Sequence, residues 1–301
     1  MNGTLAVARY TLIELSRRRI LLVFFVLGAL GLALVGFGLY FFSASFTTNV
    51  TFGPPGTPQD PAKLNRFLEL MFVSNLIGAL GLFALLIAFA IGMTVIYHDL
   101  DSGAAVAIFS KPVSRLAFTV GKLAAAIVAM IAIVGVLGVE ARLLMFLFGS
   151  GADLQQTLWA ETVAQVANAV TLMLIIMALS TVMNNIVAGV VGFIYNGVAG
   201  VVVLLHAQMV AGFLGDNGVL RVGLNVLYWL VPHELVSDAQ RQLARAQFEL
   251  FGSAGEQGGP SVDQMMAGIP GASGMADIVW WAFVVAVLAL IGYIAVRRRQ
   301  V

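Results

Sequence analysis

Residues 97–122 of the chain read YHDLDSGAAVAIFSKPVSRLAFTVGK, a polar and basic stretch between two long apolar runs. Asp99 and Asp101 place negative charge where a helix can begin, and Ser102 is a suitable N-terminal cap. Pro112 then ends the helix, because the residue before a proline disfavours helical geometry. We therefore expect a short helix lying across the hairpin of two apolar helices. We expect this stretch to be where the chain can contact a component of the cytoplasm.

The composition assigns the chain to a membrane. Of its 301 residues, 60% are hydrophobic and only 10% are charged, whereas soluble domains carry about 25% charged residues. The apolar runs are long enough to cross a bilayer, which takes about twenty residues each. The absence of cysteine excludes disulfides, iron–sulfur clusters, thiolate zinc sites and cysteine nucleophiles. We expect an all-α membrane protein that forms a single transmembrane domain over residues 1–301.

Six apolar segments predict six transmembrane helices: residues 20–42, 70–97, 116–148, 158–183, 186–214 and 278–296. The basic residues that orient them share one side of the membrane: Arg9, Arg17, Arg18, Arg19, Lys111, Arg115, Lys122, Arg297, Arg298 and Arg299. By the positive-inside rule that side is cytoplasmic. The sequence thus predicts a multi-pass protein of the cytoplasmic (inner) membrane with both termini in the cytoplasm.

Helical spacing also predicts a helix before the first span, over residues 4–19. Leu5, Ala8, Leu12 and Leu15 fall on one face of it, and its arginines can reach anionic headgroups. This pattern is typical of a helix lying in the membrane interface.

Three segments are expected outside. Residues 43–66 are rich in Gly, Pro and Thr and predict an irregular loop, and residues 149–157 predict a short turn. The third segment, residues 215–277, is the largest. Within it, residues 219–231 are apolar but too short to cross, so they re-enter the bilayer or lie in its outer interface until Pro232. Residues 234–251 then predict an amphipathic helix.

Three parts of the opening stretch carry a resemblance. They are Asp101-Ser102-Gly103, then Phe109-Ser110-Lys111-Pro112-Val113-Ser114-Arg115, and finally Gly121-Lys122. Together they resemble the first cytoplasmic loop of type-2 ABC transporter permeases, which usually shows an acidic pair, Ser-Gly-Thr, a Lys-Pro-Val-Ser-Arg run and a Gly-Lys. Ala104 stands where that family often has threonine. After this loop, Ser114 can cap the helix that returns to the bilayer.

The resemblance implies a partner and a docking site. Residues 98–115 would carry a coupling helix that binds a separate ATP-binding cassette subunit, and residues 4–19 would form an elbow helix. A second permease copy, identical or related, would complete the complex in the lipid bilayer, without nucleic acid. The implied docking residues are Asp99, Asp101, Ser102, Gly103, Ile108, Phe109, Lys111, Pro112 and Arg115. Ile108 and Phe109 are the expected apolar anchors, because they stand on a short helix with no core of its own.

The chain carries no nucleotide-binding or catalytic motif of its own. It lacks Gly-x-x-x-x-Gly-Lys-[Ser/Thr], so ATP and Mg would be bound by the partner subunit and no cofactor by this chain. His233-Glu234 matches the start of the zinc-protease motif His-Glu-x-x-His, but Ser237 stands where that motif needs its second histidine. We expect a transporter subunit rather than an enzyme.

Several polar side chains fall within the apolar segments. An amide in lipid is costly unless it faces the helix bundle or a subunit interface, where it can serve simply to join helices. The resemblance implies that the dimer interface and translocation path form mainly around the second and fifth spans. The candidates for path or interface are Asn75, Asn168, Tyr195 and Asn196. Glu140 and Arg142 fall near the outer end of their span, where we expect salt bridges to neighbours such as Glu161 or Arg221.

Two other classes of function compete with an ABC exporter. An ATPase-independent secondary transporter or channel leads one to expect charged residues at mid-membrane, and the six apolar segments place none there. An intramembrane enzyme needs a convergent Ser/His, paired Asp or metal constellation at depth, which the sequence does not offer either. The leading interpretation is the membrane subunit of an ATP-driven export complex, and the sequence leaves its cargo open.

Overall fold

The computed structural model describes residues 3–46, 61–97, 113–148, 154–215, 217–251 and 262–298. Throughout these ranges the regular structure is helical, and no strand occurs in them. The helices are α1 (Gly3–Arg17), α2 (Arg19–Phe46), α3 (Pro61–Thr94), α6 (Arg115–Leu147), α7 (Gln155–Ser180), α8 (Asn185–Val210), α9 (Gly218–Leu230), α10 (Ala239–Phe251), α11 (Val262–Ala267) and α12 (Met275–Arg298).

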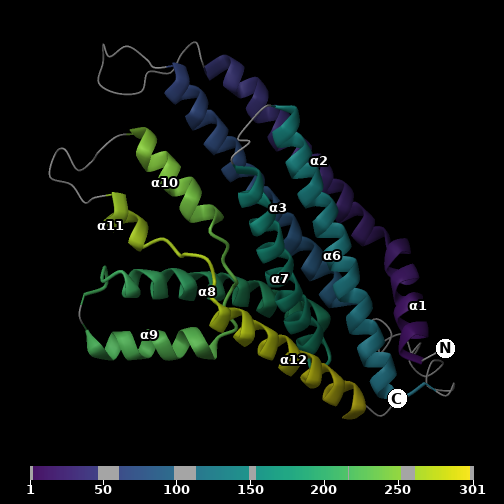
Figure 1. Cartoon of the computed structure of the whole chain (residues 1–301). Helices are drawn as coiled ribbons and strands as arrows, with labels where there is room; N and C mark the ends of the chain where they lie inside the picture. The colour runs from purple at the N-terminus through teal and green to yellow at the C-terminus, as the bar shows by residue number, and fades with distance from the viewer. Residues whose placement is uncertain are drawn as a thin grey trace.

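Six of these helices are long and apolar enough to cross a membrane: α2, α3, α6, α7, α8 and α12. They correspond in order to the six predicted spans, which confirms the all-α class and the number of apolar helices. Figure 1 shows the start of α1 and the end of α12 at the same end of the bundle. An even number of crossings requires this arrangement.

The core lies between α3 and α7, with α2 and α6 beside them (Figure 1). Helix α7 is the central element, since 61% of its most apolar window is buried against 11% for α12. Gly92 of α3 lets the two central helices approach closely, because a Cβ there would lie 3.0 Å from the Met173 carbonyl oxygen of α7. The long apolar side chains of α3, such as Leu80 and Ile87, are completely buried along this contact.

Helix α1 packs along the first turns of α6. Gly121 makes this possible, since a Cβ there would lie only 2.8 Å from the carbonyl oxygen of Thr4. The face that α1 buries contains Val7 and Leu15. Leu5, from the predicted apolar face, is 63% exposed and does not pack on α6. Contact with α6, rather than the apolar spacing alone, fixes which side of α1 is covered.

Two predicted boundaries were also wrong. The first loop is shorter than residues 43–66, because α2 continues to Phe46 and α3 begins at Pro61, where proline suits the first turn of a helix. The amphipathic helix begins at Ala239 instead of residue 234. The predicted coupling helix falls on residues that lie outside the described ranges.

Helices α8 and α9 form a hairpin beside the central helices (Figure 1). Side-chain oxygens of Asn184 and Asn217 cap the two helices by accepting backbone N–H groups. The turn after α8 uses Gly212 at φ 82°, a left-handed geometry that favours glycine. Helix α9 confirms that the apolar segment before Pro232 is helical and shorter than a span.

Candidate functional site

The first residues of α6 are held by a local N-terminal cap and by a long-range hydrogen bond to α12. Ser114 Oγ accepts the backbone N–H of Ala117 at 3.1 Å, which confirms Ser114 as the cap of α6. Arg115 is the one docking residue within the described ranges, and its Nη1 donates to the Arg297 carbonyl oxygen at 2.6 Å. The other eight implied docking residues, from Asp99 to Pro112, lie outside those ranges. The segment leading from the loop is therefore tied to the end of α12.

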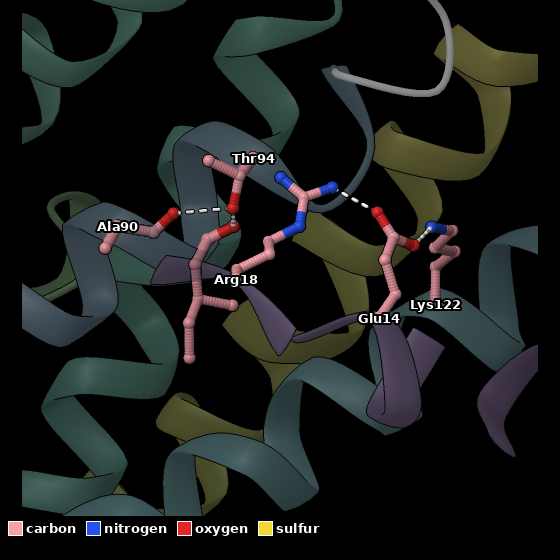
Figure 2. Close-up of polar contacts among 6 residues, drawn as sticks. Glu14, Arg18, Ala90, Thr94 and Lys122 are labelled. Atoms are coloured by element: carbon pink, nitrogen blue, oxygen red, sulfur yellow. Dashed lines mark hydrogen bonds and ion pairs between the residues drawn. The ribbon is translucent and has the colours of Figure 1, made fainter. Parts of the chain in front are cut away.

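A buried ion-pair cluster ties the same end of α6 to α1 (Figure 2). Lys122 is completely buried, and its Nζ lies 3.2 Å from Glu14 Oε2. The other carboxylate oxygen of Glu14 pairs with Arg18. Burial opposes the charge on Glu14, yet Arg18 and Lys122 outweigh it and lower the pKa of this carboxyl. Three charged groups thus bind α1 to α6 where the sequence suggested only headgroup contacts.

A partly open pocket of about 240 Å³ lies between α3, α7, α8, the start of α10 and the irregular segment that follows α9. Its polar walls come from Gln165, Asn168, Asn196, Glu234 and Gln240, and its apolar walls from Ile77, Gly78, Gly81, Leu82, Ala84, Leu85, Ala169 and Leu172. Asn168 and Asn196, two of the four predicted path residues, therefore meet at one site.

Asn168 holds the segment that carries Glu234. Its Nδ2 donates to the Leu235 carbonyl oxygen at 2.9 Å, and its Oδ1 accepts the Leu235 N–H at 2.8 Å. The next residue, Val236, exchanges two hydrogen bonds with Ser273, both 2.9 Å. Two of these four bonds occupy the carbonyl oxygens of Leu235 and Val236, which a helix starting at residue 234 would use, and the chain stays irregular until α10 begins at Ala239.

Two acidic side chains stand beside this segment. Glu161 of α7 is only 3% exposed and accepts hydrogen bonds from Ser237 and from Gln165 Nε2, the latter at 2.7 Å. Glu234 lines the pocket, and within the described ranges its carboxylate has neither a hydrogen bond nor an ion pair. Burial first, and then the nearby charge of Glu161, raise the pKa of Glu234 to about 7. The pocket therefore contains an acid that changes charge near neutral pH.

This acid lies level with the middle of α7. Asn168 lies close to the midpoint of the 26-residue helix α7, about 20 Å from either end at 1.5 Å per residue. Glu234 reaches the same pocket, so a carboxylate does stand at mid-depth of the bundle. The inference of no mid-membrane charge considered only the six apolar segments, whereas Glu234 comes from the connection between α9 and α10.

The other two predicted path residues lie elsewhere. Tyr195 donates its hydroxyl to the Pro232 carbonyl oxygen, which ties α8 to the start of the same segment. Asn75 does not turn into the bundle of this chain: it is exposed on α3, and its Nδ2 donates to the Met71 carbonyl oxygen at 2.8 Å. Its own helix thus satisfies the amide.

An aromatic stack lies on the far side of Pro232. The ring of Tyr228 lies between those of His206 and His233, at centroid distances of 4.0 and 3.9 Å. Its hydroxyl donates to Asp277 Oδ1 at 2.9 Å, which joins α9 to the first turn of α12. In the described part of the chain, no three His, Asp or Glu side chains are grouped to hold a metal ion.

Arg142 forms no salt bridge with another residue of the described ranges, contrary to our expectation. Its guanidinium lies over the ring of Trp159, with 5.5 Å between Cζ and the ring centroid, a cation–π contact. Glu161 is engaged by Ser237 and Gln165 instead. The pairing was wrong because Glu161 faces the inside of the bundle rather than its outer end.

Replacing Asn196 with leucine should separate stability from function. The Asn196 amide lines the pocket and has no hydrogen bond to another described residue, so N196L should change the unfolding temperature by no more than a few degrees. The larger apolar side chain removes a polar group from the pocket and should alter transport or dimerisation. Thermal unfolding measures the effect on stability, and a transport assay and sizing of the purified protein measure the effect on function. If transport and oligomeric size are both unchanged in N196L, Asn196 serves only in packing.

No protein-family model matches the chain, and no curated protein matches it. The fold defines its class, that of an all-helical, multi-pass membrane protein with a polar pocket among its long helices.

Proposed function

We propose that the chain is the membrane-spanning subunit of an ATP-driven export complex. A separate ATP-binding cassette subunit would bind ATP and Mg, and a second permease copy would complete the path. The observation that supports this most is the firm linkage around the loop of residues 97–122. In the last part of this stretch, α6 is capped by Ser114, bonded to α12 through Arg115 and fixed to α1 through Lys122.

This linkage gives the loop a mechanical role. A partner that pushes on the loop would move α1 and the start of α6 together, because Lys122 and Glu14 join them away from solvent. Helix α6 packs on both α3 and α7, which form two walls of the pocket. Nucleotide-driven closure of the partner would thereby change access to the pocket. In this proposal α1 is the elbow helix, with Arg9 and Arg17 exposed toward headgroups.

One observation favours a second candidate, a transporter driven by protons without an ATPase. Glu234 stands at mid-depth of the bundle with a pKa of about 7, which suits a group that loads and releases a proton in each cycle. The two candidates differ in their partner. The first requires an ATP-hydrolysing subunit that binds this chain, and the second requires none.

Purification from the native membrane decides between them. We expect the tagged chain to carry an ATP-binding subunit with vanadate-sensitive ATPase activity. Changing both Ile108 and Phe109 to alanine should release that subunit, since buried anchors contribute about 2 kcal/mol or more each. Insertion of the altered chain in the membrane is the control. An unaltered chain that purifies without any ATPase would contradict the proposal and leave the proton-driven candidate.

The orientation can be tested with single cysteines, because the chain has none of its own. We expect S253C to react with a membrane-impermeant maleimide in intact cells, and S110C to react only after the membrane is opened. Both positions lie outside the described ranges, in the predicted outer segment and the predicted cytoplasmic loop. The reverse labelling pattern would invert the topology.

A further inference from the structure

The pocket between α3, α7 and α8 has an anionic group and no cation to balance it. Glu234 supplies the carboxylate, and no lysine or arginine is among the described residues that line the pocket. The oxygen Oε2 of Glu234 lies 3.7 Å from a Cβ built at Gly200, so the carboxylate lies over the surface of α8. Glu234 is partly buried, and a carboxylate withdrawn from water without a partner is costly unless a proton or a cationic ligand neutralises it.

We infer that this pocket binds a primary ammonium group, carried by a small amine or by a lipid headgroup, with Glu234 as its counter-charge. Binding of an ammonium group does not depend on the proposed function. The further statement that the bound amine is the exported cargo rests on it.

The acceptors in the pocket match the three N–H donors of a primary ammonium. Glu234 offers its unpartnered carboxylate, and Asn196 offers an amide with no hydrogen bond to another described residue. Gln165 donates its Nε2 to Glu161, which leaves its carbonyl oxygen for a ligand. Recognition of a quaternary ammonium uses aromatic rings, and none is among the described residues that line this pocket. The aliphatic walls formed by Leu82, Leu85 and Leu172 suit the carbon chain of the amine.

Binding of a cation should strengthen as Glu234 ionises. Its pKa of about 7 means that the carboxyl is mostly protonated at pH 6 and mostly charged at pH 8. The groups that influence it are Glu161 from α7 and Tyr195 from α8. The part of α3 that lines the pocket carries no titratable side chain. Affinity for an amine should therefore rise between pH 6 and pH 8.

The test uses the purified full-length chain in detergent, with n-butylammonium chloride as the probe. We expect n-butylammonium to raise the unfolding temperature in a saturable way, since a ligand that binds the folded state stabilises it by mass action. Tetramethylammonium chloride at equal ionic strength should not. E234Q should weaken apparent binding by about tenfold or more, the scale of a lost charge-assisted contact. E249Q, which removes an exposed acid of α10, is the matched control.

A second measurement does not depend on how E234Q folds. Dicyclohexylcarbodiimide, which modifies buried protonated carboxyls, should label Glu234 in the unaltered chain, and n-butylammonium should slow this labelling. Nanodiscs identify the source of the ammonium: protection in phosphatidylethanolamine but not phosphatidylcholine assigns a lipid headgroup, and protection only by the soluble amine assigns a small amine. Protection by neither, or equal effects of n-butylammonium and tetramethylammonium, would overturn the inference. These binding assays contain neither ATP nor a partner subunit. If purification recovers no ATPase subunit, the proposed function is contradicted, while the result for ammonium binding is unaffected.

Discussion

Replacing Lys122 with methionine should loosen α1 from the bundle and lower the stability of the folded chain by about 2 kcal/mol. Removing one partner of a buried ion pair costs about 3–5 kcal/mol when the other charge is left alone. Here Glu14 keeps Arg18 and is 20% exposed, so the expected loss is smaller. For a chain of this size that loss corresponds to roughly 5 °C in unfolding temperature. Proteolysis should release α1 before the rest of the chain unfolds.

Two further variants make this result specific. In K122M combined with E14Q, the Lys122–Glu14 pair is fully neutral but Arg18 loses its carboxylate partner, so only part of the lost stability should return. R245M breaks an exposed pair in which both side chains are more than 60% accessible, and it should change stability by less than about 1 kcal/mol. Equal unfolding temperatures for K122M and R245M would show that the buried pair does not hold α1 in place.

Replacing Asn168 with leucine should have the other large effect, at the pocket. The backbone N–H and carbonyl oxygen of Leu235 would both lose their partner, and each unsatisfied buried group costs about 1–3 kcal/mol. We expect a loss of about 3 kcal/mol and release of the segment that carries Glu234. Thermal unfolding and the rate of carbodiimide labelling at Glu234 measure the two consequences.

The matched control for Asn168 is Asn196, which lines the same pocket without a hydrogen bond to another described residue. N168D keeps the acceptor for the Leu235 N–H and loses the donor, so its unfolding temperature should fall between those of the native chain and N168L. An unfolding temperature for N168L equal to that of N196L would mean that Asn168 does not fix the segment.

The predictions that succeeded depend on neighbouring residues. The six apolar helices follow from runs of apolar side chains, and the end of α9 follows from the proline two residues beyond Leu230. The cap at Ser114 is read from the residues beside it. Each of these features is decided within a few turns of chain, so the sequence alone was sufficient.

The features that could not be predicted depend on contacts between distant segments. The helix predicted from residue 234 starts only at Ala239, and Asn168, from another helix, bonds both backbone groups of Leu235 before it. The buried face of α1 is set by its approach to Gly121. The pairing of Glu14 with Arg18 could have been found, since they stand four residues apart on one helix face. Nothing in the local sequence indicates that Glu234 joins a pocket with Asn196.

The proposed function requires that nucleotide hydrolysis by a separate subunit changes access to the pocket. Leu82 is 55% exposed at the edge of the pocket, and L82C would be the only thiol in the chain. In native membranes we expect an impermeant maleimide to label L82C at rates that differ severalfold between the nucleotide-free and vanadate-trapped states. L230C on α9, away from the pocket, should label equally in both, and the change of Ile108 and Phe109 to alanine should abolish the difference at L82C. A labelling rate at L82C that is the same in both states with the native loop would contradict the account.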